Sequence, residues 1–190
     1  MHQLQIPLLI LAVIACGCES QNGGAVQSNR NFSNGGEFSS PHFGVAFSMD
    51  RTWGVLSEQE ADKQLKARGH KGDGSALILT AVKRTPTGGV VSLNAFDSQD
   101  SKQNIESFLD ERTRKAKEKS DSIEDIAVGE FTTAAGVNYR TLSYVDTTKD
   151  GKFYYQYWAT GREGRMLMFF ARMSSRELLP EIENLLLGDG

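Results

Sequence analysis

The sequence predicts an α+β domain in which helices cover both faces of a central antiparallel sheet, a three-layer α/β/α sandwich. Two observations lead to this prediction. Four β-rich segments follow one another between residues 126 and 173, and their short, turn-rich links indicate antiparallel neighbours. The last segment is apolar on both faces from Met166 to Ala171, and such a strand has to be covered on both sides.

The composition limits the function. The chain has 190 residues with 21 Lys+Arg and 24 Asp+Glu, a formal net charge of −3, which is ordinary for a soluble globular domain. Binding to the phosphates of a nucleic acid needs an excess of Lys and Arg, which this near-neutral chain does not have. We therefore expect no nucleic-acid partner. Two cysteines and three histidines leave little material for a metal cluster or a disulfide framework.

The N-terminus predicts a lipoprotein signal peptide over residues 1–15. These residues contain no Asp, Glu, Lys or Arg, and their apolar run is about half of the ~20 residues that a membrane-spanning helix needs. The stretch Val13-Ile14-Ala15-Cys16 resembles the bacterial lipobox, in which a peptidase cuts before a cysteine whose thiol carries diacylglycerol. Cys16 is therefore the expected lipidation site, because a second frame at Cys18 lacks the aliphatic residue three positions before the cleavage point.

An ordinary cleaved signal peptide and a buried N-terminal helix remain as alternatives. With lipid at Cys16, we expect export to the bacterial cell envelope and attachment to a membrane, at the periplasmic face or at the outer membrane if the host has one. Residues 16–40 are predicted to form the lipidated N-terminus and a flexible tether, since Gly, Ser, Asn and Gln dominate and no apolar period is present. The folded domain is expected over residues 41–190.

Local patterns predict each element of this domain in turn. A first strand over residues 43–48 alternates apolar and small residues, and a capping box at Ser57–Glu60 opens a surface helix that ends at Gly69. Residues 76–84 and 90–97 form a hairpin, and residues 101–119 form a helix with an apolar stripe. Four strands (126–133, 137–145, 152–160 and 165–173) and a closing helix from Ser174 to Gly188 complete the domain.

This order of elements resembles the PsbP-like superfamily. The resemblance rests on a strand that ends in Phe-Ser-Met-Asp before Trp53, a hairpin, one long helix, four meandering strands and a closing amphipathic helix. It covers about residues 42 to 187, and bacterial members include envelope lipoproteins of the DcrB-like type. The resemblance implies the fold and carries over no active site, since a fold alone does not define a function.

The sequence shows no catalytic motif, so we expect neither an enzyme nor a cofactor nor a bound metal. His42 and His70 have no second ligand-type residue at metal spacing. The segment from Asp146 to Gly151 begins like a calcium loop but lacks the closing Glu, and a hairpin turn explains it. Asp97 belongs to a short Asp/Ser-rich stretch that helix capping explains.

Candidate recognition residues come from the aromatic side chains. Period-two geometry places Lys152, Tyr154, Gln156 and Trp158 on one face of a strand, where aromatic anchors combine with polar groups. Trp53 is a further candidate, and core packing is the alternative for all three aromatic residues. The sequence thus predicts a non-catalytic envelope lipoprotein that binds an envelope protein or a small ligand. An enzyme with an unrecognised site of scattered polar residues and a purely structural envelope component are the alternatives.

Overall fold

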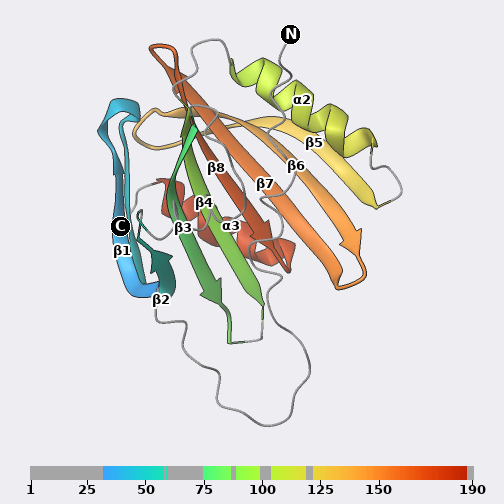
Figure 1. Cartoon of the computed structure of the whole chain (residues 1–190), viewed down its shortest axis with the longest axis horizontal. Coiled ribbons are helices and arrows are strands. Elements are labelled where there is room, and N and C mark those ends of the chain that lie inside the picture. Colours follow the sequence, from blue (N-terminus) through green and yellow to red (C-terminus); the bar gives the residue numbers. More distant parts are fainter. Residues whose placement is uncertain are drawn as a thin grey trace.

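The computed structural model describes residues 32–57, 59, 75–86, 89–98, 104–118 and 122–187. Its strands form one antiparallel eight-stranded sheet with the order β1-β2-β3-β4-β8-β7-β6-β5 (Figure 1). The strands are β1 Phe32–Ser40, β2 Val45–Leu56, β3 Ser75–Arg84, β4 Val90–Ser98, β5 Ile123–Thr132, β6 Asn138–Thr148, β7 Gly151–Arg162 and β8 Arg165–Met173. The helical elements are η2 Pro41–Phe43, α2 Ile105–Glu118, η3 Arg176–Leu178 and α3 Leu179–Leu187.

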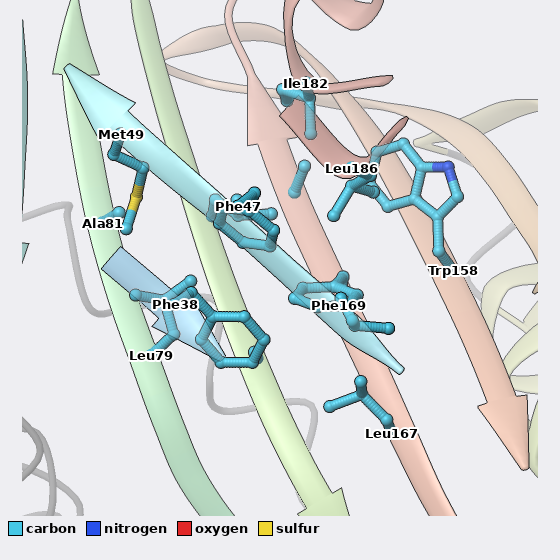
Figure 2. Close-up of a cluster of buried hydrophobic side chains, with 14 of the residues drawn as sticks. Phe38, Phe47, Met49, Leu79, Ala81, Trp158, Leu167, Phe169, Ile182 and Leu186 are labelled. Atoms are coloured by element: carbon cyan, nitrogen blue, oxygen red, sulfur yellow. The ribbon is translucent and has the colours of Figure 1, made fainter. Parts of the chain in front are cut away.

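Strands β1 and β2 form a hairpin that folds over one face of the sheet. Only the end of β2, Trp53–Leu56, pairs with β3, whereas its first half pairs with β1 alone. The rings of Phe38 and Phe47 stack on each other and contact Phe169 of β8, with centroids 5.5 and 5.9 Å away, although β8 is not a sheet neighbour of either strand. Figure 2 shows these three rings packed between the hairpin and the sheet.

Two hydrophobic clusters lie on opposite faces of the sheet. One contains Phe169 with Ile182 and Leu186 of α3, and the other contains Phe170 with Phe108 and Leu109 of α2. The two helices therefore cover opposite faces, with α2 over β5, β6 and β7 (Figure 1). The predicted central antiparallel sheet is confirmed. A plain three-layer α/β/α sandwich is not, because the β1–β2 hairpin shares the cover of one face with the short helix α3.

The tether prediction is wrong for residues 32–40, which form β1. Glycine and serine dominate this segment, but Phe38 lies opposite Phe47 in the register of the hairpin and is buried beneath it. Burial of one aromatic side chain, together with pairing of every residue of β1 except Gly35 with β2, offsets the ordering entropy that the composition alone suggested. The domain therefore includes residues from Phe32 onward. The predicted surface helix after Ser57 lies almost entirely outside the described residues.

Glycine is required where the β1–β2 hairpin changes register. Gly35 has a φ of +73°, and a Cβ atom there would lie 2.7 Å from the carbonyl oxygen of Met49. We expect Gly35→Ala to lower the free energy of unfolding by about 2–4 kcal/mol, from left-handed strain plus the steric overlap. Gly44→Ala is the matched control, because Gly44 has a φ of +69° with nothing within 4 Å of the added methyl group. Equal losses of stability in the two variants, measured by urea denaturation, would contradict this.

Stacked aromatic rings fill the α2 face of the sheet. Tyr144 stacks on Tyr155 at 4.9 Å and Tyr155 on Phe170 at 5.9 Å between ring centroids. Burial raises the pKa of Tyr155 to about 12, and burial likewise raises the pKa values of Tyr144 and Tyr157. The α2 face thus holds these phenols in their neutral form.

This burial predicts alkaline unfolding. The pKa of a tyrosine in the unfolded chain is about 10, below that of Tyr155 in the folded protein. The stability that the neutral Tyr155 phenol contributes is therefore fully present below pH 10 and is lost as the pH rises from 10 towards 12. We expect the free energy of unfolding, measured with urea, to fall steadily over this window, and Tyr155→Phe to reduce the slope. Stability that stays constant from pH 9 to 12 would mean that these phenols already ionise in the folded protein.

Candidate functional site

The two tryptophans named as recognition candidates lie in the core. Trp158 has no exposed surface and Trp53 is 3% exposed. Both belong to the same cluster as Phe169, and Figure 2 shows Trp158 beside Leu186 of α3. Neither indole is available as a protruding anchor for a partner.

The other three candidates, Lys152, Tyr154 and Gln156 of β7, do not form a continuous exposed surface with the two tryptophans. Lys152 is exposed and pairs with Glu124 at 2.5 Å, and this hydrogen bond raises the pKa of the lysine. Tyr154 is half-buried against the core, and the buried Gln156 donates its side-chain amide to the carbonyl of Tyr157 at 3.5 Å. Register places these side chains on one face as expected, but burial increases steadily from Lys152 towards Trp158.

A groove, hereafter the hairpin–α3 groove, lies between the β1–β2 hairpin and α3. Its volume is 540 Å³. The lining residues of the hairpin are Glu37, Phe38, Ser39, Ala46, Phe47, Ser48, Asp50 and Trp53, and those of α3 are Glu181, Asn184 and Leu185. Apolar and polar side chains thus alternate along one depression.

The irregular register of the hairpin shapes one end of this groove. Met49 pairs with Gly36 and Gly54 with Asn34, so four residues of β2, from Asp50 to Trp53, lie opposite the single residue Gly35. Asp50 closes the resulting loop by accepting hydrogen bonds from the backbone N–H of Thr52, at 2.7 Å, and from its hydroxyl. These two bonds lower the pKa of Asp50 and keep the carboxylate ionised.

The lining of the groove contains three carboxylates and no Lys or Arg side chain. Of its three carboxylates, Glu181 forms an ion pair with Lys83, whose ammonium group also lies 5.8 Å from the centroid of the Trp53 ring. Neither Glu37 nor Asp50 has an ion-pair partner among the described residues. Lys83 is thus held by Glu181 and Trp53, although its charge also acts on Asp50, and Glu37 and Asp50 form no ion pair within the described residues.

His42 and Asp97, which the sequence analysis considered for metal binding and helix capping, instead bond to other parts of the fold. His42 donates from Nε2 to the carbonyl of Arg162 at 3.1 Å, which links η2 to the turn after β7. Asp97 lies in β4 and pairs with Arg165, so the helix-capping explanation is wrong, and Asn104 instead caps α2 by accepting from Ser107 N–H at 2.7 Å. Within the described ranges, no group of three His, Cys, Asp or Glu side chains could hold a metal ion.

Cys16, Cys18 and His70 lie outside the described residues. In the part of the chain that the structure describes, no helix has both the length and the apolar character that crossing a bilayer requires.

The chain is similar to two solved structures. One is the solution structure of cyanobacterial PsbP (CyanoP) from Synechocystis sp. PCC 6803, with a TM-score of 0.46 and 14% sequence identity over 87% of this chain and 93% of that one. The other is a crystal structure from Bacteroides thetaiotaomicron VPI-5482, with a TM-score of 0.41 and 14% identity over 82% of this chain and 48% of that one. This chain thus spans about half of the second protein. These similarities describe the outline of the fold and not a function.

Comparison by sequence finds no related family or protein. No model of a protein family matches the chain, and no curated protein matches it.

Sequence reasoning missed most of the groove. Glu37 and Ser39 fall in the segment whose composition predicts a tether, and Asp50 enters the sequence pattern only as the end of a strand. The spacing of Phe38 behind Gly35 and Gly36 was an available signal, since paired glycines before an alternating aromatic position indicate a bulged strand. Of the predicted recognition residues, Trp53 is the one that lines the groove, as part of its wall and not as a protruding ring.

Proposed function

We propose that this protein is a non-catalytic binding domain of a bacterial cell envelope, attached to a membrane by lipid on Cys16, and that it engages an envelope protein through the hairpin–α3 groove. The lipobox-like stretch before Cys16 supports the attachment. The order of strands and helices supports membership of the PsbP-like superfamily, and the lipobox-like stretch supports its DcrB-like lipoprotein type. This superfamily assignment is part of the proposal.

The hairpin–α3 groove is the observation that carries the binding role. Its 540 Å³ falls within the range of about 300–1,000 Å³ that is usual for ligand sites. Outside the groove, four exposed carboxylates of the sheet and of α2 form ion pairs with Lys or Arg among the described residues, including Glu124 with Lys152 and Glu130 with Arg140, whereas Asp110 and Asp125 do not. Within the described residues, the groove brings Glu37 and Asp50, neither of which forms an ion pair, beside apolar side chains, so a partner of complementary charge would find polar and apolar contacts together there.

Site-specific crosslinking tests this binding role. A photo-crosslinking amino acid at position 48, within the groove, should trap an envelope protein in living cells. The same amino acid at position 150, in the exposed turn between β6 and β7, serves as the control because it lies outside the groove lining. Equal yields of the same adducts from both positions would contradict the groove as the binding surface.

Lipid attachment is a separate prediction. We expect Cys16→Ser to abolish incorporation of labelled palmitate and to release the chain from the membrane fraction or leave it unprocessed. Cys18→Ser should keep the lipid, because the aliphatic residue of the lipobox is correctly spaced from Cys16 only. Mass spectrometry of the N-terminal peptide measures the outcome. Lipid retained in the first variant and lost in the second would place the modification on Cys18.

A further inference from the structure

We propose that the occupant of the hairpin–α3 groove is a short basic segment of a protein partner, with apolar residues between its Lys or Arg side chains. This inference rests on the binding role proposed for the groove and names the chemistry of the partner. Three features of the groove carry it: its unpaired carboxylates, its apolar wall and its uncommitted hydrogen-bonding groups.

Charge selects a cationic occupant. Glu37 and Asp50 both line the groove without an ion-pair partner in the described part of the chain, and the hydrogen bonds from Thr52 keep Asp50 ionised. The charge of Lys83 also lowers the pKa of Asp50, but its ammonium group forms its ion pair with Glu181 and packs over Trp53. A ligand that brings two positive charges would complete the two missing pairs, whereas an anionic segment would be repelled.

The remaining lining favours a peptide over a small amine. The partly exposed Leu185 and the small accessible parts of the largely buried Phe47 and Trp53 form an apolar wall that an aliphatic side chain can cover. The side chains of Ser39, Ser48 and Asn184 have no hydrogen-bond partner among the described residues, and they can serve the N–H and C=O groups of a peptide backbone. A polyamine would use the carboxylates and leave both of these features without contact.

The test uses the full chain in nanodiscs of zwitterionic lipid and measures fluorescence anisotropy. The probe is the peptide Ac-Lys-Leu-Ala-Lys-Leu-NH₂ with a neutral fluorophore, and empty nanodiscs correct for its binding to lipid. We expect the Glu37→Gln/Asp50→Asn double variant to bind the probe about tenfold more weakly, from the loss of two ion pairs. Asn keeps an oxygen that accepts from Thr52, so the loop at Asp50 is preserved.

The matched control is the Glu118→Gln/Asp150→Asn double variant. It removes the same two charges from exposed positions on α2 and on the turn between β6 and β7, and neither position lines the groove. We expect unchanged affinity in this variant, and equal melting temperatures of both double variants and the parent protein. Binding to the parent protein should weaken as salt rises from 50 to 500 mM, since screening acts on exposed charges.

Four results would overturn the inference. They are a parent protein that does not bind the probe, equal affinity of the groove variant and the parent, equal binding of the acidic peptide Ac-Glu-Leu-Ala-Glu-Leu-NH₂, and competition by spermidine as strong as by the unlabelled probe. The last would assign the groove to polyamines. Crosslinking from position 48 separates these failures from failure of the binding role itself. Adducts there with no dependence on Glu37 and Asp50 would leave the groove as a binding surface for a partner of other chemistry.

Discussion

Replacing Phe169 with alanine should lower the free energy of unfolding by about 3–5 kcal/mol. Phe169 has no exposed surface, and its ring meets the rings of Phe38 and Phe47 from the hairpin and of Tyr139 from β6 at centroid distances of 5.5 to 6.2 Å. The substitution therefore removes the side chain that joins the β1–β2 hairpin to the sheet. Urea denaturation followed by circular dichroism measures the loss.

Phe170→Ala tests the opposite face of the same strand. Phe170 is also buried, against Tyr155 and Tyr157, and we expect a loss of the same size from this face. The control is Val128→Ala on β5, since Val128 is 52% exposed and should change stability by about half a kcal/mol or less. A nearly neutral Phe169 variant would mean that water reaches the face beneath the hairpin, and a nearly neutral Phe170 variant would mean the same for the face beneath α2.

Replacing Trp158 with alanine should also cost about 3–5 kcal/mol. The side chain is completely buried in the cluster that joins β8, the hairpin and α3, and its truncation leaves a large cavity. Its Nε1 has no hydrogen-bond partner in the described residues, so Trp158→Phe should cost less, because it also removes an unsatisfied donor. Thermal and urea unfolding of the two variants give the comparison.

The Trp158 result also decides between core packing and surface recognition at this end of β7. Lys152→Ala removes an exposed side chain from the same face and should change stability by about half a kcal/mol or less. If Trp158→Ala is as stable as Lys152→Ala but no longer binds a partner, this face of β7 is a binding surface and the core-packing interpretation is wrong.

Most strands could be predicted because their signals are local. The alternation of small and apolar residues and the turn chemistry between strands predicted β3, β4 and β6 to β8 to within a few residues. The apolar stripe of the long helix predicted the buried side of α2, where Phe108, Leu109 and Ala116 contact the sheet. The stretch from Met166 to Ala171 correctly indicated a strand covered on both faces.

The candidate site could not be predicted in the same way, because its walls come from segments far apart in the sequence. The groove joins Glu37 of β1 and Asp50 of β2 to Glu181 of α3. No spacing rule links these positions, and the composition of residues 32–40 indicated a disordered segment. The period-two pattern of β7 placed Tyr154 and Trp158 on one face correctly, but it carried no information about what covers that face.

By itself, the sequence determined the order of the elements, the antiparallel pairing of the last four strands and the need to cover β8 on both sides. Only the tertiary structure decided that the β1–β2 hairpin supplies part of that cover, that Trp53 and Trp158 are core residues and that a groove opens beside α3. The physical reason is that alternation and turn chemistry act between residues close in the chain. The burial of Phe38 and Phe47 on Phe169 instead depends on a contact between segments more than a hundred residues apart.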